Sequence, residues 1–157
     1  MTPAIEALIV QIATEETLPV DLLRAQVLVE SSGQSDAFRF EPAYYQQYIK
    51  GHPAKGLAYG PLAACSYGLL QILLETAIEQ GFTGRPEQLF DPEIGLRVGA
   101  AELVRLWTLV GKTPESYRHA LALYNGGQSL RVVPESIWPS AVVRYVTAIC
   151  GSEPPRA

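Results

Sequence analysis

The sequence predicts a single domain of mainly α-helical structure, and three observations support this prediction. Its 157 residues match the size of one ordinary globular domain. The composition, 48% hydrophobic and 18% charged, is typical of a chain that folds around a core. Apolar residues recur at helical spacing in most segments, and no convincing run alternates apolar and polar residues. We therefore expect one mainly α domain over residues 1–150 and a flexible tail over residues 151–157.

Seven segments combine helical spacing with signals for the start or the end of a helix. Pro3 suits the first turn of the first helix, and Asp91 and Thr113 are natural N-caps of later helices. Gly126 and Gly127 together form a natural helix stop. We expect helices over residues 3–16, 19–31, 41–50, 68–80, 92–110, 113–125 and 139–150.

Charge and composition exclude several classes of function. The net charge is −4, and no run of Lys and Arg could neutralise phosphates, so nucleic-acid binding is not expected. The N-terminal stretch lacks the basic region of a secretory signal, and no long apolar window predicts a transmembrane helix. His52 and His119 are isolated, so we expect no metal and no cofactor. Cys65 and Cys150 are expected to be idle thiols rather than a disulfide or a metal pair.

One carboxylate stands out in the stretch VLVESSG, residues 27–33. Glu30 ends an otherwise apolar helix, and Gln26 and Val27, one turn earlier, place it on or beside the apolar face. Partial burial and the negative end of the helix dipole both raise the pKa of a carboxyl. A carboxyl that is still protonated near neutral pH is what a general acid requires. From spacing alone, Glu30 is either a general acid or an ordinary glutamate at a helix boundary.

Three blocks in a fixed order resemble the signature of a known family. Glu30-Ser31, GLLQI (residues 68–72) and LALYNGG (121–127) resemble the Glu-Ser, Gly-Leu-Met-Gln and Ala-Tyr-Asn blocks of soluble lytic transglycosylases, which are related to goose-type lysozyme. LFDPEIGLRVGAAEL (89–103) and YVTAI (145–149) resemble two further stretches of the same family. The resemblance implies a lysozyme-like helical domain that acts on peptidoglycan glycan strands without a cofactor.

The resemblance also implies a reaction. Glu30 would act first as an acid, protonating the oxygen between N-acetylmuramic acid and N-acetylglucosamine. As a carboxylate it would then take the proton of the muramic 6-hydroxyl, which closes onto C1 and gives a 1,6-anhydro sugar. In this family the N-acetyl group of the substrate is thought to stabilise the charge at C1, so no second carboxylate is required.

Five further residues match functional positions of the family. Tyr124 matches a tyrosine that hydrogen-bonds and orients the catalytic carboxyl. Gln71 and Asn125 match polar residues that contact substrate amides, and Ser31 and Ser66 match small polar positions that line the site. Structural interpretations also remain open. Tyr124 can be a core aromatic, Gln71 can bond local backbone, and either serine can bond a helix end.

Two alternatives to a lyase remain at this stage. A lysozyme-type hydrolase would use water in place of the 6-hydroxyl, and Asp36 and Glu41 are the carboxylates close enough in sequence to hold it. A non-catalytic wall-binding or virion module could keep the same fold. Such a module would have no need of Glu30 in a position where its charge is disfavoured.

The long interval between Glu30 and Gly68 indicates the phage and prophage branch of the family. It contains FEPAYYQQYI (residues 40–49), which resembles the insert of phage-type members. The tyrosines of this insert can stack on sugar rings or pack internally. This branch implies phage lysis or tail proteins as further partners, and a protein made in the cytoplasm that acts on the cell wall.

Three positions depart from the family pattern. Leu70 stands where Met is usual, a swap that conserves volume. Leu123 replaces the usual Ala before Tyr-Asn, and we expect it to tighten that wall of the groove. Gly95 replaces an Asn, which puts a local backbone contact in doubt but not the chemistry.

Overall fold

The computed structural model describes residues 1–52 and 59–151. Its α-helices are α1 (Pro3–Glu15), α2 (Val20–Ser31), α3 (Pro42–Tyr44), α4 (Leu74–Glu79), α5 (Pro92–Leu109), α6 (Tyr117–Gly126) and α7 (Ser140–Cys150). Short helices of other types are the π-helical η1 (Tyr45–Ile49) and the 3₁₀ helices η2 (Gly60–Ala64), η3 (Pro86–Phe90), η4 (Gln128–Val132) and η5 (Glu135–Ile137). The strands are β1 (Phe38–Phe40), β2 (Cys65–Tyr67) and β3 (Ile72–Leu73). Apart from Gly151, the predicted tail lies outside the described residues.

The ends of the long helices largely confirm the sequence signals. Asp91 caps α5 as predicted, and its carboxylate accepts two backbone N–H groups of the first turn at 3.0 Å. Helix α6 begins later than predicted, because Thr113 and Ser116 bond each other's backbone in a separate turn. It ends as predicted, with Gly127 in a left-handed conformation at φ +91°.

The domain is mainly helical, as predicted, and it also contains three short strands that no sequence pattern indicated. The three strands form an antiparallel sheet in the order β1-β2-β3. Strands of two or three residues are too short to show the alternating pattern that identifies a strand. The helix predicted over residues 68–80 is wrong in its first half. Gly68 and Gln71 have φ values of +71° and +47°, which a right-handed helix excludes.

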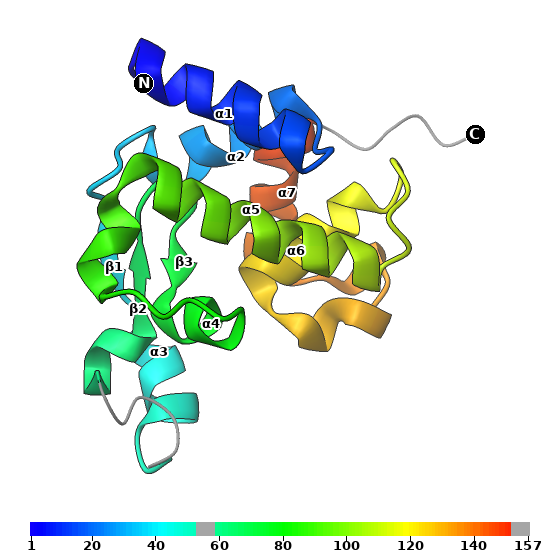
Figure 1. Ribbon diagram of the computed structural model, residues 1–157. Coiled ribbons are helices and arrows are strands. Elements are labelled where there is room, and N and C mark those ends of the chain that lie inside the picture. The colour runs from blue at the N-terminus through cyan, green and yellow to red at the C-terminus, as the bar shows by residue number, and fades with distance from the viewer. Residues whose placement is uncertain (53–58, 152–157) are drawn as a thin grey trace.

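The insert over residues 41–50 is helical, as predicted, but of two helix types. It starts as the single turn α3 behind Pro42 and continues directly into the π-helical η1. The π-helical η1 packs against α3 and η2. The insert therefore extends from the sheet and away from the main core (Figure 1).

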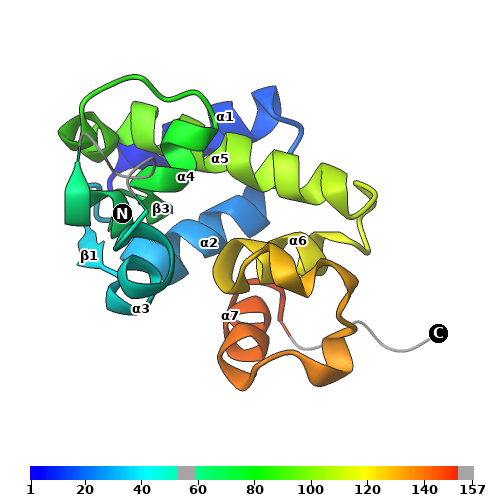
Figure 2. The same cartoon turned by 90° about the horizontal axis from the view of Figure 1, so that it is seen from below.

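The molecule has two parts, which we name by their elements. The helical body consists of α1, α2, α5, α6 and α7, and the sheet lobe consists of β1–β3, α3, η1 and α4. Figure 2 shows α2 between the sheet lobe on one side and α6 and α7 on the other. The main core lies in the helical body and contains side chains from every one of its helices, among them Ile9, Leu23, Leu103, Leu121 and Val146. Each such side chain stabilises the fold by roughly 1.5–3 kcal/mol through burial.

Gly95 lies where α5 passes the preceding loop. A Cβ atom at this position would lie only 2.4 Å from the carbonyl oxygen of Leu89. The glycine that replaces the usual asparagine therefore permits a close approach of backbone to backbone, which a side chain would prevent.

The two cysteines are free thiols. Cys65 is buried, Cys150 is half-buried, and burial raises the pKa of both thiols. A raised pKa keeps a thiol protonated and a poor nucleophile. Among residues 1–52 and 59–151, no helix has both the length and the apolar character needed to cross a membrane.

Candidate active site

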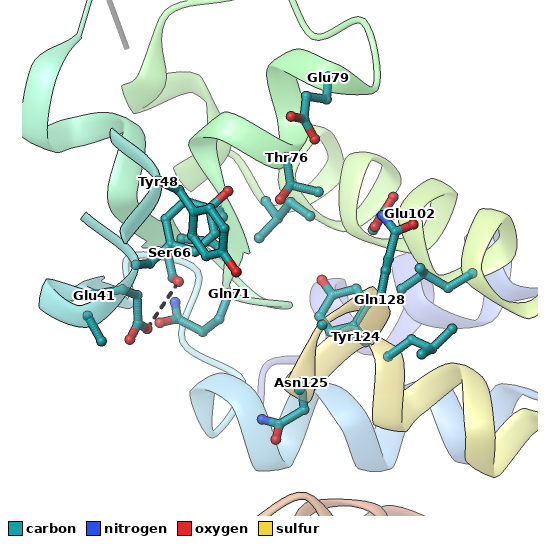
Figure 3. A pocket seen from close by; sticks show the side chains of 18 of the residues that line it. Glu41, Tyr48, Ser66, Gln71, Thr76, Glu79, Glu102, Tyr124, Asn125 and Gln128 are labelled. Atoms are coloured by element: carbon teal, nitrogen blue, oxygen red, sulfur yellow. Dashed lines mark hydrogen bonds between the residues drawn. The ribbon is translucent and has the colours of Figure 1, made fainter. Parts of the chain in front are cut away.

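A cleft of about 660 Å³ lies between the sheet lobe and the helical body. Residues of both parts line it, and Figure 3 shows Glu41, Ser66 and Gln71 facing Tyr124 and Asn125 across it. The polar and aromatic side chains of its lining include Glu30, Arg39, Glu41, Tyr44, Tyr48, Ser66, Gln71, Glu79, Glu102, Tyr124 and Asn125. This is the size of cavity that takes a ligand of several rings.

Glu30 lies in the last turn of α2 and is half-buried beside the cleft. Burial raises its pKa from 4.5 to about 7. The hydrogen bond from Tyr145 and the charge of Arg39 act in the opposite direction, while the charge of Glu41 adds to the increase. A large fraction of the Glu30 carboxyl is therefore protonated at neutral pH, as a general acid requires.

The direct partner of Glu30 comes from α7. The hydroxyl of Tyr145 donates to Glu30 Oε1 at 2.5 Å, across 115 positions of sequence. The side-chain amide of Gln26, one turn before Glu30 on α2, donates to the same hydroxyl at 3.1 Å. Gln26, Tyr145 and Glu30 thus form a hydrogen-bonded chain that ends at the cleft.

The loop between β2 and β3 receives side-chain hydrogen bonds at three successive carbonyl groups. Gln71 Nε2 donates to the carbonyl of Gly68 at 3.0 Å and also to that of Ala37. Ser31 Oγ lies 2.9 Å from the carbonyl of Leu69. The hydroxyl of Tyr124 donates to the carbonyl of Leu70 at 2.9 Å. These bonds attach the loop to α2 and α6 and so define one wall of the cleft.

Gly99 on α5 permits the close packing behind this loop. A Cβ atom at Gly99 would lie 2.7 Å from Leu70 Cβ and 3.2 Å from the Tyr124 hydroxyl oxygen. Leu70 is itself fully buried. The hydrogen bond between Tyr124 and the loop therefore depends on the absence of a side chain at Gly99.

On the sheet lobe, Arg39 and Ser66 are paired across β1 and β2. Because paired residues share a face of a sheet, both side chains are directed to the cleft, where both are lining residues. Arg39 Nε donates to Glu41 Oε1 at 2.5 Å, and Ser66 Oγ lies 3.4 Å from the same oxygen (Figure 3). Both charges of this pair are close enough to Glu30 to influence the pKa of its carboxyl.

The insert contributes two tyrosine rings to the far end of the cleft. The rings of Tyr44 and Tyr48 lie 4.8 Å apart, and both residues line the cleft. Tyr45 packs instead against Phe40, with ring centroids 5.8 Å apart, and is not a lining residue. The structure therefore separates the insert tyrosines into two that face the cleft and one that supports the insert.

No group of three or more His, Cys, Asp and Glu side chains with the arrangement of a metal site occurs within the described part of the chain. His119 is near Trp138, and its Nε2 lies 2.9 Å from the carbonyl of Leu130. This histidine is thus engaged with local structure away from the cleft.

Comparison with known proteins gives the family. The family model of the transglycosylase SLT domain matches residues 7–132, which is most of the chain. The chain belongs to this family. It is a peptidoglycan lytic transglycosylase, which makes it an enzyme rather than a purely structural module. Searches of curated proteins and of solved structures found no match.

The transglycosylase domain brings five of the six predicted site residues to one cleft, namely Glu30, Ser66, Gln71, Tyr124 and Asn125. Ser31 does not line it, because its buried hydroxyl bonds the backbone of α2 and of the loop. The binding and catalytic roles assigned to these six residues remain predictions.

One predicted contact is corrected. The hydrogen bond to the Glu30 carboxyl comes from Tyr145, whereas the hydroxyl of Tyr124 bonds the loop at Leu70. Tyr145 reaches Glu30 because α7 packs directly on α2. The hydroxyl of Tyr124 on α6 points instead to the loop between β2 and β3.

Sequence reasoning missed Gln26, Arg39 and Tyr145 as parts of the site. For Tyr145 a signal existed, because a tyrosine on the apolar face of the last helix needs a partner for its hydroxyl. Gln26 likewise is a glutamine on the apolar face of α2. Arg39 had no local signal, because its strand was not predicted.

Proposed function

We propose that this lytic transglycosylase cleaves the β-1,4 bond between N-acetylmuramic acid and N-acetylglucosamine and leaves a 1,6-anhydro end. Glu30 is the single acid and base of this reaction. The observation that carries the proposal is the half-buried Glu30 at the cleft, whose carboxyl has a pKa of about 7 and one oxygen bonded by Tyr145.

In the first step Glu30 acts as an acid. Tyr145 donates to Oε1, so the acidic proton resides on Oε2 and passes to the glycosidic oxygen as the bond from C1 to that oxygen breaks. The positive charge at C1 is stabilised by the N-acetyl group of the substrate, as the family resemblance implies. N-acetylglucosamine then leaves with its hydroxyl restored.

In the second step the Glu30 carboxylate acts as a base. It accepts the proton of the muramic 6-hydroxyl while that oxygen bonds to C1, so no water is consumed and Glu30 is protonated again. The bond from Tyr145 and the charge of Arg39 both favour the carboxylate, and burial favours the acid. This balance lets one group perform both steps near neutral pH.

The walls of the cleft supply the substrate contacts. Ser66 and Gln71 on one side and Asn125 on the other present polar groups to the amides of the amino sugars. Leu123 is buried in the wall of the cleft next to Asn125, and we infer that it narrows the cleft there relative to an alanine. Tyr44 and Tyr48 form an aromatic surface on which a more distant sugar ring of the glycan chain stacks.

Hydrolysis is the competing reaction, and it depends on Glu41. Glu41 lies in the cleft and contributes to the pKa of Glu30, whereas Asp36 is not a lining residue. Glu41 Oε1 already accepts from Arg39 and lies near Ser66. We infer that Glu41 serves this polar cluster and does not position a water at C1.

The test is digestion of purified peptidoglycan followed by mass spectrometry of the muropeptides. Ends lighter by one water identify 1,6-anhydro products and support the lyase, whereas full-mass reducing ends overturn it in favour of hydrolysis. The Glu41→Gln variant is digested in parallel. Its anhydro products should persist unchanged if Glu41 has no part in the partition between the two reactions.

We also propose that the chain belongs to the phage and prophage branch. The proposal rests on the length of the interval between Glu30 and Gly68 and on the insert FEPAYYQQYI within it. Delivery to the wall by phage lysis or tail proteins follows from that assignment. It is tested by the neighbours of the gene, which should encode lysis or tail proteins.

A further inference from the structure

We propose that Gln26 is a positioning residue for the acid and base chemistry of Glu30, and that it acts by orienting the Tyr145 hydroxyl. The proposal rests on the proposed role of Glu30 and adds a residue that does not touch the substrate. The role of Gln26 is to set the direction of the two hydrogen bonds that run from Gln26 on α2 to Tyr145 on α7 and from Tyr145 to Glu30.

The geometry of this chain is direct. Gln26 is fully buried and lies one helical turn before Glu30 on α2. Its Nε2 donates to the Tyr145 hydroxyl at 3.1 Å, and that hydroxyl donates to Glu30 Oε1 at 2.5 Å. Tyr145 is almost fully buried as well, so no solvent competes for its hydroxyl.

A hydroxyl carries only one proton, and this makes the donation from Gln26 decisive. Because Gln26 donates to the oxygen of Tyr145, the single proton of that hydroxyl is directed to Glu30. Glu30 Oε1 is then committed as an acceptor, and Oε2 is left to carry the acidic proton. Without Gln26 the Tyr145 hydroxyl can instead accept a proton from Glu30 Oε1, which places the acidic proton on the wrong oxygen.

Stability does not explain an amide at this position. Within the described residues Gln26 Oε1 is buried and has no hydrogen-bond partner, which disfavours the folded state. Its neighbours Leu23 and Val27 are fully buried and apolar. An unbranched apolar residue of similar length would fill this space without the unpaired oxygen. The donation to Tyr145 is therefore what Gln26 supplies.

The electrostatic surroundings of Glu30 are also defined. Arg39 and Glu41 face it from the sheet lobe, Tyr145 from α7 and Tyr124 from α6, and Glu102 on α5 lies near Tyr124. A change at Gln26 leaves all of these groups in place. A shift in the titration of Glu30 after that change therefore reports the orientation of Tyr145.

The experiment compares Gln26→Met with the wild-type enzyme. Methionine keeps the length of the side chain and removes the donor. We expect kcat to fall by about 3- to 10-fold, as for one lost hydrogen bond, with KM within about twofold. We also expect the pKa of Glu30, measured by carbon NMR titration of the free protein, to rise by several tenths of a unit because its bond from Tyr145 weakens.

A double-mutant cycle separates this role from a general structural one. If Gln26 acts only through Tyr145, Gln26→Met has no further effect on kcat in a Tyr145→Phe background. Tyr117→Phe is the matched control, because Tyr117 is an equally buried tyrosine whose hydroxyl has no partner within the described residues and which lies outside the cleft. It should change neither kcat nor the titration.

Three results would overturn the proposal: an unchanged titration and kcat in Gln26→Met, additive effects in the cycle, or the same shift in Tyr117→Phe. Gln26→Leu serves if the methionine variant does not fold, and the titration is read on folded protein only. Failure of the proposed function has a different signature, because Glu30→Gln would then retain activity whatever the result at Gln26.

Discussion

The two walls of the cleft are built in different ways. On the helical body, Gln26 and Tyr145 are buried, Glu30 is half-buried, and direct hydrogen bonds join the three. On the sheet lobe, Arg39 on the short strand β1 is mostly exposed, and Tyr48 of the insert is 43% exposed. The buried wall can shift a pKa because water is excluded from it, whereas the exposed wall can contact a substrate with little change in its own ionisation. The proposed acid and base thus lies in the more buried wall, whereas the sheet lobe offers exposed groups for contact with substrate.

Removal of the buried acid should have the largest effect. Glu30→Gln is expected to reduce the clearing of cell-wall suspensions by about 10²–10⁴-fold, because the variant lacks the proposed proton donor. Turbidity of purified walls measures this loss, and Glu6→Gln on the surface of α1 is a control that should keep full activity. Clearing at the wild-type rate by Glu30→Gln would remove Glu30 from the mechanism.

The same variant should gain stability in a way that depends on pH. The pKa of Glu30 is about 7 in the folded chain and near 4.5 in the unfolded one, so its ionisation penalises only the folded state. The carboxyl contributes its full stability below about pH 4.5, and this contribution is lost as the pH rises to about 7. Glu30→Gln should therefore match the wild type near pH 4 and exceed it at pH 8 by on the order of 2–3 kcal/mol. Melting curves at the two pH values measure this difference, and an equal difference at both would contradict the raised pKa.

The next effect tests how the loop is attached to the buried wall. Gly99→Ala should destabilise the protein by about 1–3 kcal/mol, because the new Cβ meets Leu70. Helix propensity alone predicts the opposite sign, a gain of about 1 kcal/mol for alanine in a helix. Unfolding in denaturant distinguishes the clash with Leu70 from the effect of helix propensity, because the two predict opposite signs for the change in the free energy of unfolding. A stabilised Gly99→Ala variant would show that the loop between β2 and β3 moves to accommodate the new Cβ atom at little cost.

A smaller effect is expected on the exposed wall. Tyr48→Ala should raise KM for glycan strands by about 3- to 10-fold with little change in kcat, because a stacked sugar ring loses its platform. Tyr45→Ala is the matched control, since Tyr45 packs on Phe40 outside the cleft. Equal KM values for the two variants would indicate that the insert serves only its own packing.

The smallest expected effects are shifts in the pH profile, caused by charges on the sheet lobe that act on Glu30 of the helical body. The alkaline limb of kcat/KM should follow the pKa of Glu30, near 7. Glu41→Gln removes a negative charge and should move this limb to lower pH, whereas Arg39→Gln removes a positive charge and should move it to higher pH. Shifts of a few tenths of a unit are expected across a solvated cleft. Shifts in the same direction would contradict the opposite effects of the two charges on the pKa of Glu30.

Much of the helical body was predictable from local pattern. Helices α1, α2, α5 and α7 lie within one or two residues of the predicted spans, because each has a continuous apolar face and clear end signals. Glu30 was recognisable for the same reason, since its place on an apolar face at a helix end already implies a raised pKa. The spacing of apolar residues along a helix predicts which of its positions face the core.

The partners of those buried groups were decided by tertiary structure. Tyr145 reaches Glu30 only because α7 packs on α2, and no local pattern specifies which of several tyrosines does so. The sheet is likewise invisible to periodicity, since strands of two or three residues exist only through their pairing. The sequence alone thus identified the carboxyl that was a candidate for burial. The packing of distant segments determined which groups bond it, because hydrogen bonds across a core depend on the orientation of whole helices rather than on their residues' spacing.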